Sequence, residues 1–151
     1  HKLQEIKKFC KSSNRKFFLS NNVKLALKLD LDGVYLPSFD KSNRINIYSK
    51  KNKFLILGSA HNLKEIKIKE NQNVDALFLS SLFNKKKTFL GLEKFKILKS
   101  KTKVKVIALG GINEKNINKL KLLNIYGYAA ISFFNNIKKK APKKGPFKFL
   151  V

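Results

Sequence analysis

The sequence is poor in several residue types, and each shortage excludes a class of protein. Cys10 is the one cysteine, so a disulfide scaffold is excluded and a reducing compartment is expected. Three prolines and seven glycines are too few for a collagen-like or low-complexity chain. No apolar run approaches the roughly 18 residues that cross a membrane. No charged and then apolar leader follows His1, so we expect no signal peptide, no membrane association and a cytoplasmic protein.

Acidic residues are also scarce, since 9 Asp and Glu face 34 Lys and Arg, which gives a formal net charge of +25. The electric field of so large a positive charge attracts polyanions, so a basic nucleic-acid-binding protein is one hypothesis. However, only Arg15 and Arg44 are arginines, the residue that makes bidentate contacts with phosphate and guanine. The lysines are spread along the whole chain. We therefore interpret them as solvated helix faces and do not expect a nucleic-acid partner.

The apolar residues predict a packed protein. They make up 43% of the 151 residues and include 13 Phe and 4 Tyr, which is typical of a single globular domain. Short β-rich runs alternate with stretches of helical period, the pattern of βα units and a parallel sheet. Strands are predicted at Phe17–Leu19, Gly33–Leu36, Phe54–Leu57, Asp75–Leu79, Val104–Leu109 and Gly127–Ser132.

Helices are predicted between these strands. They cover residues 3–10, 23–29, 63–70 and 92–98, and a last one runs to Leu123. Asn62 is predicted to cap the helix over 63–70, and Asn113 the one that ends at Leu123. We assign residues 1–140 to one domain and residues 141–151, which contain two of the three prolines, to a tail.

The strand ends decide between an open doubly wound sheet and most of a (β/α)8 barrel. In such barrels the active site lies at the carboxyl ends of the strands, and the last two loops commonly hold phosphate. Gly110 and Gly111 end one of the last strands, where backbone N–H groups before a helix are suited to an anion. This favours the barrel. The alternative is that the glycine pair only makes a tight turn.

Seven segments, in this order and with this spacing, resemble the thiamine phosphate synthase and thiazole tautomerase family. They are FLSNNVKLAL (18–27), DGVYLPSFD (32–40), LGSAHN (57–62), DALFLSSLF (75–83), LGLEKF (90–95), VIALGGIN (106–113) and GYAAISFF (127–134). The resemblance extends from Leu3 to Phe134. It implies a phosphate-binding (β/α)8 TIM barrel of which this chain, starting in the second helix, lacks the first two strands. Such an incomplete barrel would expose strand edges.

The resemblance also implies an activity. Enzymes of this family join a hydroxymethylpyrimidine pyrophosphate to a thiazole phosphate, with Mg²⁺ as cofactor, and release pyrophosphate and thiamine phosphate. The expected partners are therefore these small-molecule substrates, and a homo-oligomer is left open. The resemblance places the thiazole phosphate at Gly110, Gly111, Ile131 and Ser132.

For the pyrophosphate, the resemblance implies contacts from Ser20, Ser59 and a loop lysine. Spacing favours Lys87 over Lys85 and Lys86, and Lys87 and Ser59 are the expected catalytic residues.

The metal positions depart from the family pattern. Asp40 keeps one metal carboxylate, but Asn21 stands where the family has a second, and an amide is a weaker ligand of Mg²⁺. Pro37-Ser38 replace a Gly-Gln pair, as in the tautomerase branch, whereas Ser80-Ser81 stand at the place of the tautomerase histidine. The alternative function is therefore a phosphate-binding relative, tautomerase-like or non-catalytic, that has lost the synthase chemistry.

Most of these residues also have a purely structural interpretation. A carboxylate or hydroxyl near a helix start is commonly a cap, and small polar residues after a strand commonly make a turn. On this interpretation Asp40, Ser59 and His61 are caps, Ser20 and Asn21 are turn residues, Cys10 is a core residue and the lysine triplet 85–87 is a solvated loop.

Overall fold

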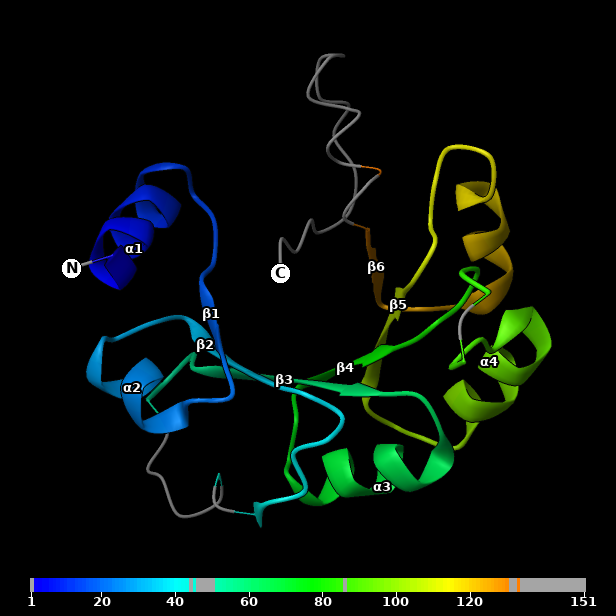
Figure 1. Ribbon diagram of the computed structural model, residues 1–151, viewed down its shortest axis with the longest axis horizontal. Helices are drawn as coiled ribbons and strands as arrows, with labels where there is room; N and C mark the ends of the chain where they lie inside the picture. The colour runs from blue at the N-terminus through cyan, green and yellow to red at the C-terminus, as the bar shows by residue number, and fades with distance from the viewer. Residues whose placement is uncertain (1, 44, 46–50, 86, 131–132, 134–151) are drawn as a thin grey trace.

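The computed structural model describes residues 2–43, 45, 51–85, 87–130 and 133 (Figure 1). Helices separate most of the six strands along the chain, and β3 follows β2 with no α-helix between them in the described residues. The strands are β1 (Phe18–Ser20), β2 (Gly33–Leu36), β3 (Leu55–Ala60), β4 (Ala76–Leu79), β5 (Lys105–Leu109) and β6 (Gly127–Ala129). The helices are α1 (Lys2–Ser12), α2 (Val23–Lys28), α3 (Leu63–Asn71), α4 (Gly91–Ser100) and the 3₁₀ helix η2 (Ile117–Leu123).

All strand pairs are parallel, and the strands lie in the order β1-β2-β3-β4-β5-β6. This order has no reversal, as in a (β/α)8 barrel, whereas a doubly wound sheet reverses at a switch point. The predicted α/β fold with barrel-type strand order is therefore confirmed. The strand edges expected of a barrel that lacks strands are present as well. Within the described residues β1 and β6 each have one neighbour, so the sheet is open.

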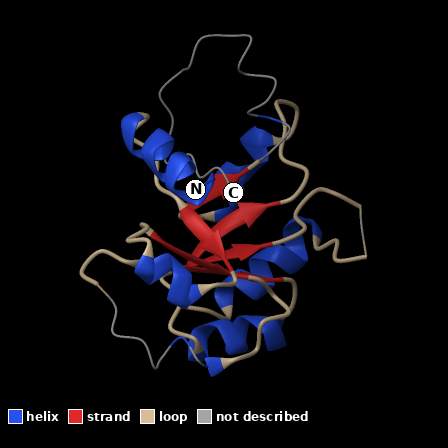
Figure 2. Ribbon diagram, turned by 60° about the vertical axis from the view of Figure 1, so that its left-hand side comes forward, coloured by secondary structure: helices blue, strands red, loops and turns tan. Residues whose placement is uncertain are grey.

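The curved sheet buries both of its faces. On the outer face, strand residues such as Leu77 and Val106 pack against Ile66 of α3 and Phe95 of α4. On the inner, concave face the buried residues are Leu57, Ala76, Phe78, Ile107 and Ala129. Figure 2 shows the strands gathered at the centre, with the helices placed around them. Side chains alternate between the two faces along a strand, so every second residue lies on the inner face up to the carboxyl end of each strand.

Helix α1 behaves differently from the other helices. None of its residues is buried, and Ile6 and Phe9 on its apolar face are 44% and 63% exposed. Cys10 on this helix is a free, half-buried thiol and not a fully buried one. The interpretation of Cys10 as a core residue is therefore wrong, because the helix does not press its apolar face against the sheet.

The start of α3 matches the sequence prediction. Asn62 is its N-cap, and the Asn62 Oδ1 accepts a hydrogen bond of 2.9 Å from the Glu65 backbone N–H. The Glu65 carboxylate in turn accepts one of 2.7 Å from the His61 N–H. Together these bonds satisfy two backbone N–H groups at the start of α3.

The start of the last helix differs from the prediction. Asn113 does not cap it, because η2 begins only at Ile117 with Asn116 as its N-cap. The side-chain amides of Asn113 and Asn116 both donate to the Gly111 carbonyl, at 3.3 and 2.8 Å. Together with the bond of 3.0 Å from the Lys115 N–H to the Asn113 Oδ1, they hold residues 113–116 in a turn before η2.

The last strand is shorter in the described residues than predicted. It ends at Ala129, and the predicted positions Ile131 and Ser132 lie outside the described residues, as do Lys86 and the proposed boundary between residues 140 and 141.

Candidate active site

The carboxyl ends of the parallel strands meet at one edge of the sheet. This edge brings together Ser20 at the end of β1, Asp40 after β2, Ser59 near the end of β3 and Gly110 after β5, which are far apart in the sequence. The topology thus assembles the predicted site residues on the side of the sheet where barrel enzymes bind their substrates.

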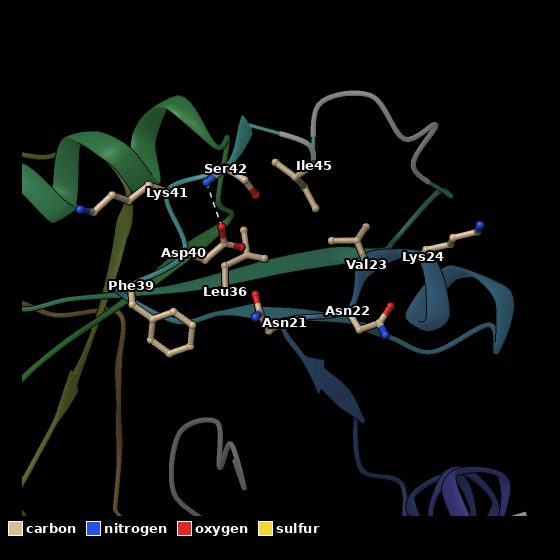
Figure 3. A pocket seen from close by; sticks show the side chains of 10 residues that line it. All are labelled: Asn21, Asn22, Val23, Lys24, Leu36, Phe39, Asp40, Lys41, Ser42 and Ile45. Carbon is tan, nitrogen blue, oxygen red and sulfur yellow. Dashed lines mark hydrogen bonds between the residues drawn. The ribbon is translucent and has the colours of Figure 1, made fainter.

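A cavity of about 530 Å³ opens between the turn after β1 and the loop after β2. Figure 3 shows the side chains that line it. The two predicted metal ligands, Asn21 and Asp40, both contribute to its wall. The complete lining is Asn21, Asn22, Val23, Lys24, Leu36, Phe39, Asp40, Lys41, Ser42 and Ile45. Ser20, Ser59 and Lys87 are not part of it.

Asn21 is held by its backbone in a tight turn. Its φ is 54°, in the left-handed region that asparagine tolerates better than most residues. Its N–H donates to the Tyr35 carbonyl at 2.8 Å, which fixes the turn to β2. Asn22 then caps α2 by accepting from the Leu25 N–H at 3.0 Å. Asn21 is therefore a turn residue, as its structural interpretation predicted, and its exposed amide also faces the cavity.

Asp40 is half-buried and held in a turn of its own. Its N–H donates to the Pro37 carbonyl at 3.0 Å, and its Oδ1 accepts from the Ser42 N–H at 2.9 Å (Figure 3). The second of these bonds is that of an Asx turn rather than a helix cap.

Two residues behind Asp40, Lys69 of α3 and Gln72 at its end, were not predicted as part of the site. Both are fully buried, and both donate to the Asp40 backbone carbonyl. Burial lowers the pKa of the Lys69 ammonium below its ordinary value of 10.5, and the negative charges of Asp40 and Glu65 partly offset this by raising it. One sequence signal could have revealed Lys69. It follows Ile66 by three residues, on the face of α3 that turns to the sheet.

The donor set at the cavity fits Mg²⁺. A carboxylate and an amide oxygen are hard ligands, and Mg²⁺ normally takes only one or two carboxylates, with water and substrate phosphates completing its octahedron. In the part of the chain that the structure describes, no group of three His, Cys, Asp or Glu residues could hold a metal on its own. A cation here would therefore depend on Asp40, on Asn21 and on oxygens of the substrate.

Ser59 and His61 lie at the end of β3. Ser59 is buried on the inner face, in register with Phe78 of β4, and is 5% exposed. His61 Nδ1 lies 2.8 Å from the Ser80 carbonyl and 3.1 Å from the Ser80 Oγ. His61 thus joins the ends of β3 and β4. The interpretation of Ser59 and His61 as caps is wrong, because Asn62 provides the cap of α3.

The glycine pair is packed against the loop after β4. Gly110 and Gly111 have φ values of +105° and +76°, and a Cβ on them would lie 2.5 Å from Ser81 Oγ and 2.6 Å from the Asn84 nitrogen. The Phe83 N–H donates to the Gly110 carbonyl at 2.8 Å. The two glycines are therefore required by the fold itself, as the tight-turn interpretation predicted. Their role toward phosphate stays a prediction.

The remaining predicted residues are exposed. Ser20 lies at the end of β1, and Lys87 lies in a turn between β4 and α4. The described helices include none that is long and apolar enough to cross a membrane.

Comparison with known proteins places these features in a family. The family model described as "Thiamine monophosphate synthase" matches residues 1–134. A thiamine-phosphate synthase of Prochlorococcus marinus is 32% identical over 85% of this chain and 38% of its own length. That of Clostridioides difficile is 32% identical over 87% of this chain and 64% of its own length.

A solved structure agrees with these sequences. The thiamine phosphate pyrophosphorylase from Pyrococcus furiosus superposes with a TM-score of 0.68 and 28% identity, over 83% of this chain and 61% of that one. The chain thus spans less than two thirds of the length of these relatives.

Proposed function

The chain belongs to the thiamine monophosphate synthase family, and on that premise we propose that its protein couples hydroxymethylpyrimidine pyrophosphate to thiazole phosphate, a transferase step of thiamine biosynthesis. The observation that carries the proposal is the cavity at the carboxyl edge of the sheet, whose wall includes both Asn21 and Asp40. We place the reaction in the cytoplasm and leave the oligomeric state to measurement.

In the proposed reaction the bond between the pyrimidine methylene carbon and the pyrophosphate oxygen breaks, and its electron pair leaves with the pyrophosphate. The thiazole nitrogen then donates its lone pair to the cationic carbon, which gives thiamine phosphate. The positive charge stays in the thiazolium ring of the product. The protein's task is to stabilise the departing anion and to hold the two rings in line.

The residues divide this task between two ends of the site. Asp40 and Asn21 would hold Mg²⁺, which neutralises charge on the leaving pyrophosphate when bound. The Lys87 ammonium and the hydroxyls of Ser20 and Ser59 would add positive charge and hydrogen bonds to the same anion.

The thiazole phosphate is proposed to lie at the other end of the site. The backbone N–H groups of Gly110 and Gly111 would hold it, together with Ile131 and Ser132 outside the described residues. The start of this loop is a strand end followed by a turn, a suitable place for an anion.

A turnover assay on the full-length protein tests this proposal. It supplies both substrates with Mg²⁺ and follows thiamine phosphate and released pyrophosphate together. We expect equal amounts of both products, loss of turnover with a chelator, and recovery when Mg²⁺ is restored. Asp40→Asn, which is expected to turn over far more slowly, serves as the control. A folded protein that forms neither product would contradict the proposal.

A second candidate function rests on Asn21, the neutral side chain at a metal position. A relative that keeps the phosphate end of the site and has lost the synthase chemistry would bind thiazole phosphate without forming product. Calorimetry with thiazole phosphate alone separates the two candidates when it is run beside the turnover assay.

A further inference from the structure

Behind the cavity wall, a lysine is completely removed from solvent. Lys69 of α3 is 0% exposed, and its stem lies over Gly58 of β3, where an added Cβ would come within 3.0 Å of the Lys69 Cδ. Burial of an ammonium is costly unless strong acceptors surround it. Here the Lys69 Nζ donates to the Asp40 carbonyl at 2.7 Å and to the Gln72 Oε1 at 2.9 Å.

Gln72 extends this arrangement along the loop. It is also 0% exposed, and its Nε2 donates to the Asp40 carbonyl at 3.1 Å and to the Ser42 carbonyl at 2.8 Å. The buried pair thus holds two carbonyls of the segment 40–42 from the α3 side. The Asp40 carboxylate on the same segment accepts from the Ser42 N–H and lies at the cavity.

These contacts restrict where the carboxylate can lie. The Asp40 N–H is bonded to Pro37 and its carbonyl to Lys69 and Gln72, so the backbone on both sides of its Cα is fixed. A side chain with a fixed backbone and a bond to Ser42 has few positions left. Burying the Lys69 ammonium costs desolvation free energy, and core packing does not require that cost, since an apolar side chain of the same length would fill the space. The bonds of the ammonium go to this loop and to Gln72.

We propose that Lys69 and Gln72 are positioning residues that hold the Asp40 carboxylate in place to bind a divalent cation. The inference rests on the proposed function to the extent that Asp40 is taken as the cation ligand. The pair does not touch the cavity, so it acts through the backbone of residues 40–42. Groups that orient a metal ligand commonly change metal affinity 10- to 100-fold when they are removed.

Two variants of opposite chemistry test this. Lys69→Met keeps the length of the side chain and removes the buried charge together with its bond to the Asp40 carbonyl. Gln72→Glu keeps the shape and offers Lys69 a buried partner, but it replaces the Nε2 donor with an oxygen that repels the carbonyls of Asp40 and Ser42. Lys67→Met is the matched control, since Lys67 lies on the same helix with a side chain 57% exposed and paired with Glu70.

The readout is binding of Mg²⁺ in the presence of inorganic pyrophosphate, measured by calorimetry without any turnover. We expect the Kd for Mg²⁺ to rise about tenfold or more in Lys69→Met and Gln72→Glu and to change less than twofold in Lys67→Met. Thermal melting of each variant, without Mg²⁺, establishes that it is folded at the temperature of the titration.

Several results would overturn the inference. One is an unchanged Kd in either folded variant, and another is an equal loss in the Lys67→Met control. If the unaltered chain bound no Mg²⁺, the assignment of Asp40 as a ligand would fall, and this inference with it. If Mg²⁺ binding followed the expected pattern while no thiamine phosphate formed, the inference would stand and only the proposed reaction would be contradicted.

Discussion

The two ends of the candidate site are built in different ways. At the metal end, defined by Asn21 and Asp40 on the cavity wall, side chains hold the backbone, and the donors come from the buried Lys69 and Gln72. At the glycine end, defined by Gly110 and Gly111, the chain packs closely against the loop after β4: Gly111 faces the backbone of Phe83 and Asn84, and Gly110 faces the Cα and side chain of Ser81.

This difference predicts two kinds of sensitivity. Where backbones touch, any added carbon atom disrupts the packing, so the glycine end is limited by space. Where side chains hold a loop, substitutions of similar shape preserve the fold, so the metal end is limited by charge and hydrogen bonding. Four substitutions, in order of decreasing effect, can test that division.

At the glycine end, Gly110→Ala is expected to lower the free energy of unfolding by about 2–4 kcal/mol, since it combines a strained φ with overpacking. Its Cβ would lie 2.5 Å from Ser81 Oγ and 2.9 Å from the Ser81 Cα. Denaturant unfolding measures the loss. Gly127→Ala is the control, because a Cβ at Gly127 meets nothing within 4 Å, and its expected change is within about 0.5 kcal/mol. Equal losses of unfolding free energy in Gly110→Ala and Gly127→Ala would contradict the idea that close packing limits the glycine end.

At the metal end, Asp40→Asn is expected to reduce kcat/KM for thiamine phosphate formation by about 100-fold, the scale of losing one electrostatic contact to the transition state. The amide keeps the acceptor oxygen for the Ser42 N–H, so the free energy of unfolding should change by less than about 1 kcal/mol. Steady-state kinetics and denaturant unfolding on the same preparation separate the two effects. A large loss of stability would show that this end is limited in the same way as the glycine end.

Asn21→Asp adds a second carboxylate to the same cavity. Aspartate tolerates the left-handed φ of 54° about as well as asparagine, so the fold should be unaffected. We expect the affinity for Mg²⁺ to rise about tenfold, since a carboxylate is the better ligand. Calorimetry measures this directly. A rise in synthase rate would count against the non-catalytic alternative, and an unchanged Mg²⁺ affinity would exclude residue 21 from the metal site.

The smallest expected effect concerns a bond that joins the elements carrying the two ends. Thr102 Oγ1 donates to the Glu70 carboxylate at 2.6 Å, and so ties the end of α3 to the segment before β5. Thr102→Val should lower the free energy of unfolding by about 1 kcal/mol at neutral pH.

The bond between Thr102 and Glu70 also predicts that the stability of the fold depends on pH. Hydrogen bonds from Lys67 and then from Thr102 lower the pKa of Glu70 below its ordinary value of 4.5. At pH values between this lowered pKa and 4.5, the folded chain therefore binds fewer protons than the unfolded chain. Glu70 contributes stability that is fully present above pH 4.5 and is lost as the pH falls through its lower, folded pKa. The difference between Thr102→Val and the unaltered chain should narrow on acidification, and a difference that widens would contradict this assignment.

Local patterns were sufficient for most of the fold. The strand Gly33–Leu36 and the cap at Asn62 were predicted at the residues where the structure has them. Both depend on neighbours within a few residues in the sequence. The strand is an apolar run between a glycine and a proline, and the cap is an asparagine three residues before a glutamate. Such signals do not require knowledge of the rest of the chain.

One failure is local, and the others depend on packing between distant parts of the chain. Asn113 has the chemistry of a cap, and its Oδ1 accepts from the Lys115 N–H, but the residues that follow it form a turn and η2 begins only at Ile117. Cys10 has the periodicity of a core residue, but α1 leaves that face exposed. The burial of Lys69 was not predicted, because a lysine in a helix is normally solvated.

Short-range patterns in the sequence therefore specify the alternation of strands and helices, the parallel order that follows from it, and the chemistry available at each strand end. Tertiary packing selects which of these groups share a site. It brings Asn21 and Asp40 to one cavity, buries Lys69 and Gln72 behind Asp40, presses residues 81–84 against the glycine pair, and leaves the sheet open within the described residues. The two contributions differ because periodicity and capping act over a few residues, whereas burial and close backbone approach exist only after distant segments pack together.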